Sequence, residues 1–171
     1  EATHAQHARP ARVRLGRGDA VGLLALPGEW VVPLNFLAWF AIQAGAGLLA
    51  WRLPSEVFAA DCPLFRARGW ERDGHLYRRW LRVDRWKRFL PDAAPLLPGG
   101  FAKSRLRGTA PDYLSRFVLE TRRAEFTHWL ALASVPLFCL WNDWWVVGVM
   151  AGYALATNLP CLLTQRYNRL R

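Results

Sequence analysis

The chain opens its first long apolar stretch at Trp30 and closes it at Trp51. Asn35 and Gln43 are the only strongly polar side chains inside this stretch. A helix of about 20 apolar residues spans the roughly 30 Å hydrocarbon core of a bilayer. The stretch therefore predicts a membrane-spanning helix, and its two polar side chains are expected to face protein rather than lipid.

A second apolar region predicts a helical hairpin. Residues 112–141 are expected to form one long helix, capped by Asp112 or a neighbour, that begins polar and ends apolar. Asn142-Asp143 would form a tight turn, and residues 144–163 would cross back. The pattern thus predicts an all-α integral membrane protein with about three transmembrane helices.

The region between the apolar stretches is basic. Residues 52–125 hold 16 of the 23 Lys and Arg residues. Within it, apolar residues of the segment 76–90 recur at helical spacing and alternate with Arg and Lys, and Pro91 follows. This pattern predicts a basic amphipathic helix lying in the headgroup plane. The alternative is a helix packed on a soluble core.

The charge distribution favours a lipid partner. The net charge is +10, and the basic residues flank the apolar stretches, as expected for contact with anionic headgroups. The 10 Trp residues are typical of the membrane interface. No zinc-finger, RRM or helix-turn-helix pattern is present, so we expect no nucleic-acid partner.

The same charges predict the orientation. Lys and Arg are absent from the Asn142-Asp143 turn and abundant in the 52–125 segment and the C-terminal tail. The turn should therefore face outward, and the basic segment and C-terminus should face the cytoplasm. We expect a basic arm at residues 1–29 and a membrane-embedded domain at 30–171. The side of the arm stays open, because three crossings would place its arginines outside.

The first candidate site lies on the predicted helix 112–141. Arg122, Glu125 and His128 share one helical face. Glu125 and His128 lie near the predicted entry into lipid, where ionisable side chains are costly unless they are paired. Glu125 could orient the imidazole so that His128 removes a proton from a hydroxyl. The alternative is a structural Glu–His–Arg network.

The spacing Glu125-x-x-His128 also occurs in di-iron carboxylate bundles, which need the motif twice and further glutamates. Because the motif occurs once here, we expect no metal and no cofactor. The three cysteines, Cys62, Cys139 and Cys161, are expected to be free thiols.

The second candidate site follows in the last apolar stretch. Asn158 lies within that stretch and needs a polar partner, for which His128 or Glu125 is suitable if the two helices are antiparallel. Gln165, Arg166 and Asn168 follow at the predicted inner interface. An arginine there can grip a phosphate or carboxylate with two hydrogen bonds, or it can extend to the headgroups.

The third candidate is a cluster of cations outside the apolar stretches. Lys87, Arg88 and Lys103 are predicted to form a phosphate-binding patch. The alternative is a surface loop attracted to anionic lipid.

These residues stand in stretches that resemble the glycosyl-4,4'-diaponeurosporenoate acyltransferases. The resemblance covers about residues 30–171, and its closing motif is the most specific. The matching pieces are Arg52-Leu53-Pro54, Trp86-Lys87, Leu90-Pro91-Asp92, Phe101-Ala102-Lys103, Glu120-Thr121-Arg122-Arg123-Ala124-Glu125 with His128-Trp129, and Asn158-Leu159-Pro160-Cys161 with Gln165-Arg166-Tyr167-Asn168-Arg169.

The resemblance implies a multi-pass enzyme of the bacterial cytoplasmic membrane that transfers a fatty acyl group to a hydroxyl of a glycosylated lipid or carotenoid. Acyl-CoA or a similar donor would be a substrate. The resemblance assigns no catalytic residue. From the residues themselves we expect His128, Glu125 and Asn158 to be catalytic, and Lys87, Arg88, Lys103, Arg122, Gln165, Arg166 and Asn168 to bind substrate. The alternative is a non-catalytic subunit that binds a lipid or carotenoid within a larger membrane complex.

Overall fold

The computed structural model describes residues 23–24, 26–60, 62–90, 100–101, 106 and 108–170. Within these residues the chain is helical and contains no strand, in agreement with the predicted all-α class. Most of the predicted arm 1–29, and Lys103 of the predicted phosphate patch, lie outside the described residues.

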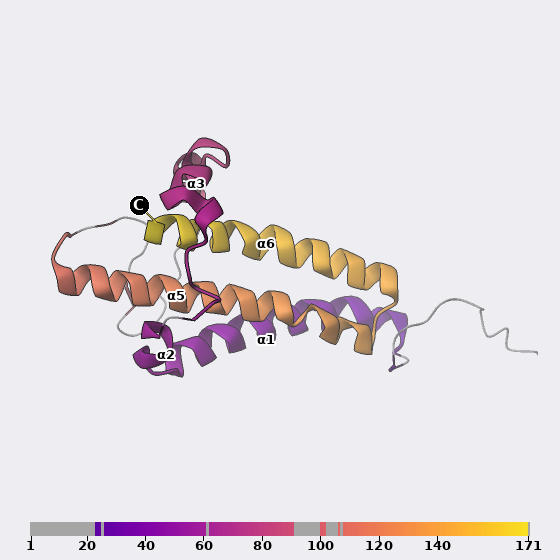
Figure 1. Cartoon of the computed structure of the whole chain (residues 1–171). Coiled ribbons are helices and arrows are strands. Elements are labelled where there is room, and N and C mark those ends of the chain that lie inside the picture. The colour runs from indigo at the N-terminus through magenta and orange to yellow at the C-terminus, as the bar shows by residue number, and fades with distance from the viewer. Residues whose placement is uncertain are drawn as a thin grey trace, which may run out of the picture.

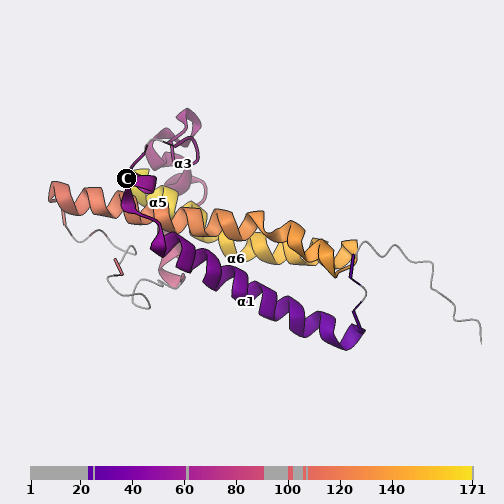
Figure 2. The ribbon, with the colours of Figure 1, turned by 90° about the horizontal axis from the view of Figure 1, so that it is seen from below.

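Three long helices lie side by side. They are α1 (Gly28–Arg52), α5 (Pro111–Ala133) and α6 (Trp144–Leu170). Helix α5 packs against both α1 and α6 and lies between them (Figures 1 and 2). The short helix α2 (Ser55–Ala59) follows α1 and packs against α5. Helix α5 is therefore the central element of the bundle.

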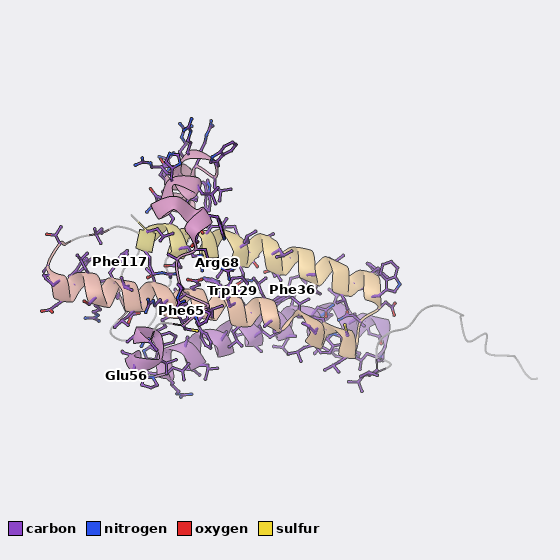
Figure 3. All side chains as sticks on the ribbon, in the orientation of Figure 1. Phe36, Glu56, Phe65, Arg68, Phe117 and Trp129 are labelled. Carbon is purple, nitrogen blue, oxygen red and sulfur yellow. The ribbon has the colours of Figure 1, made fainter. Side chains whose placement is uncertain are left out.

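Helices α1 and α6 are long and apolar enough to cross a membrane. Only 17% of the residues in the apolar part of each are buried, whereas a core helix of a soluble protein would be mostly buried. Phe36 and Phe40 on α1 are each 73% exposed (Phe36 is labelled in Figure 3). Such a surface is stable next to hydrocarbon and costly next to water, so we describe the chain as a membrane protein.

The single helix predicted for residues 112–141 is wrong in two details. Helix α5 ends at Ala133, and a 3-10 helix, η4 (Val135–Leu140), continues to the turn. Pro136 lies at the start of η4, and a proline has no N–H with which to continue an α-helix. At the other end Ala110 is the N-cap and provides no side-chain hydrogen bond, Pro111 is the first helical residue, and Asp112 lies in the first turn, where its negative charge favours the helix dipole.

A buried pair of amides joins α1 to the turn before α6. Asn35 and Asn142 donate to each other's side-chain oxygens, each over 2.9 Å. Trp141 Nε1 also donates to the Asn35 oxygen over 2.8 Å. Asn35 therefore faces protein, as predicted, and it fixes the N-terminal end of α1 against the hairpin.

The segment predicted as one amphipathic helix, 76–90, forms separate short helices. These are α3 (His75–Arg79), α4 (Val83–Trp86) and η2 (Lys87–Phe89). Arg82 has a left-handed backbone, with φ of 49°, which breaks the helical path. The continuous helix is thus wrong, while its placement in the headgroup plane stays a prediction.

Packing against α6 explains the break. With the 3-10 helix η1 (Gly69–Gly74), these pieces form a small unit, residues 69–90, that we call the head. Tyr77 and Val83 of the head are buried against Tyr167 of α6. A straight helix could not bring both side chains to the end of α6, so tertiary burial outweighs the local helical preference. The head lies beside the C-terminal end of α6, and nitrogen-tipped side chains project from it (Figures 1 and 3).

A buried ion pair fixes the head to α6. Arg166 donates from Nε to Glu71 Oε1 over 2.7 Å and from Nη2 to Glu71 Oε2 over 3.0 Å. Tyr77 and the Arg68 backbone N–H also donate to the Glu71 carboxylate. Burial alone would raise the pKa of Glu71, but these hydrogen bonds outweigh it and lower the pKa to about 2. Burial and the adjacent carboxylate raise the pKa of Tyr77 to about 12, so the phenol stays a donor.

The amide pair predicts a loss of stability on substitution. Asn35→Leu leaves polar atoms of Asn142 and Trp141 buried without their partner, which should lower the free energy of unfolding by about 1–3 kcal/mol. Thermal unfolding in detergent, followed by circular dichroism, measures the change. Phe36→Leu, at an exposed neighbouring position, is the control and should unfold like the wild type. Equal midpoints for Asn35→Leu and the wild type would contradict the prediction.

The lowered pKa of Glu71 predicts an acid-dependent stability. Its contribution is complete above about pH 4.5, the ordinary pKa of the group, and is lost as the pH falls toward about 2. Glu71→Gln should destabilise the protein by about 3–5 kcal/mol at neutral pH, because Arg166 loses a buried partner.

Unfolding midpoints measured at a series of pH values test this prediction. The difference between the wild type and Glu71→Gln should shrink between about pH 4.5 and pH 2. Glu56→Gln, which changes an exposed glutamate labelled in Figure 3, should show little difference at any pH. A difference in unfolding midpoint between the wild type and Glu71→Gln that stays constant down to pH 2 would contradict the proposed contribution of ionised Glu71.

Candidate functional site

His128 and Asn158 meet where α5 and α6 lie side by side. His128 Nδ1 lies 2.9 Å from Asn158 Oδ1. Asn158 is fully buried and His128 is half-buried. His128 is one of the two partners predicted for Asn158 from the sequence. The antiparallel arrangement of α5 and α6 brings His128 within reach of Asn158 (Figure 1).

The hydrogen bonds of Asn158 determine which imidazole nitrogen carries the proton. Asn158 Nδ2 donates to the Ala154 carbonyl over 2.9 Å and to Thr157 Oγ1 over 3.1 Å. Its Oδ1 must therefore face His128, and an amide oxygen only accepts hydrogen bonds. Nδ1 of His128 is consequently the protonated nitrogen, and in the neutral ring Nε2 carries the lone pair. This is the tautomer that a general base needs.

Gln43 of α1 completes the cluster. Its Nε2 lies 3.4 Å from Asn158 Oδ1, in a long hydrogen bond. All three long helices therefore contribute a polar side chain at the same level of the bundle. Sequence analysis expected Gln43 to face protein but did not include it in the site, although its position in an otherwise apolar helix was the available signal.

Glu125 forms strong hydrogen bonds with residues other than His128, and its predicted role in orienting the imidazole stays a prediction. The buried carboxylate of Glu125 accepts hydrogen bonds from Arg166 Nη1 over 2.8 Å, from Arg169 Nη2 and from Trp129 Nε1 over 3.2 Å. Sequence analysis placed Arg122, Glu125 and His128 on one helical face. The two guanidinium groups of α6 outcompete the neighbouring imidazole because they carry full charges.

Arg166 has all of its N–H groups occupied. Besides Glu71 and Glu125, its Nη1 and Nη2 donate to the carbonyls of Leu64 and Arg66 over 3.1 and 3.0 Å. These bonds use all five donors of a guanidinium. These contacts give Arg166 a structural role, because it joins the head, α5 and α6, and its binding of substrate stays a prediction.

Arg122 lies near Arg166 and has fewer hydrogen-bond partners. Its Nη1 donates to the carbonyls of Phe58, Ala59 and Ala60, at 2.8, 3.2 and 3.5 Å. Its Nε is buried and has no hydrogen-bond partner in the described part of the chain. Arg122 therefore holds the end of α2 against α5 and keeps donors available for a ligand.

The other predicted binding residues are dispersed around the end of α6. Lys87 Nζ donates to Asn168 Oδ1 over 2.8 Å and lies 5.1 Å from the centre of the Tyr167 ring. Arg88 is exposed and lies over Phe89. Gln165 has a buried side-chain oxygen without a partner. Lys87 and Asn168 therefore join the head to α6, and the structure does not bring Arg88 to His128.

One cavity lies near these residues, and a second lies at the other end of the bundle. A pocket of about 230 Å³ lies between the head and the ends of α5 and α6, and Arg122, Arg166, Arg169 and Glu71 are among its lining residues. A larger cavity of about 590 Å³ lies at the opposite end, mainly between apolar side chains of α1 and α6 that include Phe36 and Met150. The described ranges contain no group of three or more His, Cys, Asp or Glu side chains that could hold a metal ion.

Sequence analysis missed Glu71, Tyr77 and Arg169 as parts of the ion-pair network. Glu71 stands in a basic, aperiodic segment, and Tyr77 was counted among the apolar positions of a helix that does not form. No local signal identifies Glu71, because its partner Arg166 is 95 residues away in the sequence. Tyr77 joins the network by donating to Glu71, six residues earlier, so its role depends on the same distant ion pair.

Comparison with known proteins gives a consistent result. Residues 61–171, which include the head, α5 and α6, match the family model described as glycosyl-4,4'-diaponeurosporenoate acyltransferase. A protein of that name from Staphylococcus haemolyticus is 32% identical over 133 residues, covering 78% of this chain and 77% of the relative. One from Staphylococcus aureus strain N315 is 28% identical over 133 residues, covering 78% and 80%.

No solved structure matches the chain. The two sequence comparisons nevertheless agree with each other, and the family model includes the residues that form the His128–Asn158 contact and the ion-pair network. The chain therefore belongs to the glycosyl-4,4'-diaponeurosporenoate acyltransferase family.

Proposed function

We propose that this protein transfers a fatty acyl group from a thioester donor to a hydroxyl of a glycosylated carotenoid or a related glycolipid, at the cytoplasmic side of the bacterial inner membrane. The observation that carries the proposal is the His128–Asn158 contact. The names of the relatives supply the reaction class and the kind of acceptor. His128 and Asn158 replace the Glu125–His128 pair as the proposed catalytic unit.

In the proposed reaction, His128 Nε2 takes the proton of the acceptor hydroxyl as its oxygen forms a bond to the acyl carbonyl carbon. The tetrahedral intermediate then collapses, and the carbon–sulfur bond breaks. The departing thiolate takes the proton back from the imidazolium. Asn158 keeps the ring in the required tautomer and stabilises its protonated form through the hydrogen bond to Nδ1.

Gln43 is the proposed donor to the developing oxyanion. Its amide reaches Asn158 only through a long hydrogen bond of 3.4 Å, and a primary amide carries two N–H donors. A donor at this position could stabilise the negative charge that forms on the carbonyl oxygen.

The apolar surroundings suit a long hydrophobic substrate. Met150, which lines the larger cavity, is eight residues from Asn158 on α6, or about 12 Å along the helix axis. One leaflet of a bilayer core is about 15 Å thick, half of the roughly 30 Å total. A chain of leaflet length bound at His128 could therefore extend between α1 and α6 to this cavity.

The proposed topology has three passes and a cytoplasmic head. The C-terminal half of α5 with η4 would form the third pass, because its position between α1 and α6 shields its polar side chains from lipid. The positive-inside rule favours a cytoplasmic head and an outward Asn142-Asp143 turn. Arg166 is eight residues after Asn158 on α6, so the level of the His128–Asn158 contact would lie about 12 Å from Arg166 along the helix axis.

Substitution of the proposed base tests the function. His128→Ala should lower the rate of acyl transfer by about 10²–10⁴-fold, because general-base catalysis contributes that range. Asn158→Leu should lower it about tenfold, since one oriented hydrogen bond is worth up to about 1.4 kcal/mol. The assay follows transfer from acyl-CoA to glycosylated carotenoid or glycolipid acceptors in membranes, with mass spectrometry of the product.

Cys161→Ala is the matched control. Cys161 is three residues from Asn158 on the same helix, and its thiol contacts the Thr157 carbonyl. Full activity of this variant excludes an acyl-cysteine intermediate at that position. Activity of correctly folded His128→Ala close to that of the wild type would eliminate the proposed mechanism.

A further inference from the structure

More positive than negative side chains surround the pocket between the head and the ends of α5 and α6. Its volume is about 230 Å³, and Arg122, Arg166, Arg169 and Glu71 line it, with Phe65 and Val118 among its apolar residues. The carboxylate of Glu125 accepts hydrogen bonds from Arg166 and Arg169. Arg66 lines the pocket as well. Apart from Arg66, the cluster combines three guanidinium groups with two carboxylates.

The two carboxylates do not compensate all three cations. Arg166 binds both Glu71 and Glu125, and Arg169 binds Glu125. Arg122 donates hydrogen bonds to the backbone carbonyls of Phe58, Ala59 and Ala60 and lies 6.0 Å from the centre of the Phe65 ring. Among the described residues it has no carboxylate partner, so one of these three positive charges is not compensated there, and such a charge is costly without an anionic partner.

Unused N–H donors accompany the excess charge. The Arg169 side chain is only 8% exposed, and its Nη1 has no hydrogen-bond partner among the residues that the structure describes. Arg122 Nε is also buried without a partner, and within the described part of the chain Arg122 Nη2 makes no hydrogen bond either. Buried N–H groups of charged side chains are usually satisfied, so these donors indicate a ligand.

We propose that this pocket binds a phosphate group, held by Arg122 and Arg169, with Arg166 as the positioning residue between them. Planar guanidinium groups match the oxygens of a phosphate with paired hydrogen bonds. Glu71 and Glu125 hold Arg166 and Arg169 at the wall of the pocket. The pocket therefore has a rigid arginine wall with unused donors.

The position of the pocket identifies the phosphate as part of the acyl donor, an assignment that rests on the proposed function. Arg122 is six residues from His128 on α5, or about 9 Å along the axis, and Arg169 is eleven residues from Asn158 on α6, or about 16 Å. A donor with its phosphate at the pocket and its thioester at His128 needs an extended arm between the two groups. The phosphopantetheine arm of coenzyme A, or of an acyl carrier protein, has this arrangement.

Equilibrium binding to the purified full chain in a neutral detergent tests the phosphate site without turnover. The probes are coenzyme A, 4'-phosphopantetheine, pantetheine and inorganic phosphate, measured by isothermal titration calorimetry. Coenzyme A and 4'-phosphopantetheine should bind, and pantetheine, which lacks the phosphate, should bind at least tenfold more weakly. Equal binding of pantetheine and 4'-phosphopantetheine would overturn the proposal.

Arginine variants place the site. Arg122→Gln and Arg169→Gln should each raise the Kd for coenzyme A by about 10–100-fold, as expected for loss of a charged hydrogen bond. Arg79→Gln, at an exposed position of α3, is the matched control and should change the Kd less than twofold. If Arg169→Gln does not fold, Arg122→Lys provides the test, because lysine keeps the charge but loses the planar fork. Unchanged affinity in Arg122→Gln and Arg122→Lys would refute the site.

Nanodiscs with and without phosphatidylglycerol distinguish the two sources of phosphate. Suppose that coenzyme A does not bind, whereas phosphatidylglycerol binds to the wild type and not to Arg122→Gln. This result would overturn the donor assignment in favour of a lipid headgroup. His128→Ala should bind coenzyme A like the wild type. Loss of coenzyme A binding in Arg122→Gln therefore supports the pocket even if His128→Ala stays active and the proposed mechanism fails.

Discussion

The fold depends on one guanidinium group with no unused donor. Arg166 binds Glu71 of the head, Glu125 of α5 and two backbone carbonyls of the chain that leads to the head. Three parts of the molecule that are distant in sequence are thereby joined at the end of α6. Charged groups buried this deeply are stable only when their partners are placed well, so this network determines the position of the head on the bundle.

This network also explains why the polar residues of α5 have separate roles. Glu125 is committed to Arg166 and Arg169, which leaves His128, one turn farther along, to pair with Asn158. A neutral amide beside the imidazole is compatible with a base whose proton must leave and return, because it fixes the tautomer without adding a fixed charge. The ion pairs and the proposed proton-transfer pair thus share a helix but not their partners.

The polar groups also divide the bundle along its length. The Asn35–Asn142 pair closes the hairpin end, the His128–Asn158–Gln43 cluster lies between the ends, and the arginine cluster lies beneath the head. Outside these levels α1 and α6 present mainly apolar side chains to their surroundings. Such an arrangement suits an enzyme whose proposed substrates are hydrophobic along most of their length and polar at the reacting group.

The sequence by itself determined which segments are apolar helices and which polar residues inside them need partners. The apolar stretches identified α1 and α6 because lipid-facing helices need an apolar surface on most sides. The isolated Asn158 in an apolar helix indicated a partner on the preceding helix, and His128 is that partner. The motifs of residues 120–129 and 158–169 were sufficient to identify the family.

Only the tertiary structure decided how the charged residues are paired. Spacing along α5 suggested Glu125 with His128, but arginines from α6 occupy that carboxylate. The segment 76–90 has the periodicity of one helix, yet burial of Tyr77 and Val83 against Tyr167 divides it. Local patterns describe a residue's neighbours within one element, whereas a buried charge selects its partners from all elements that surround it.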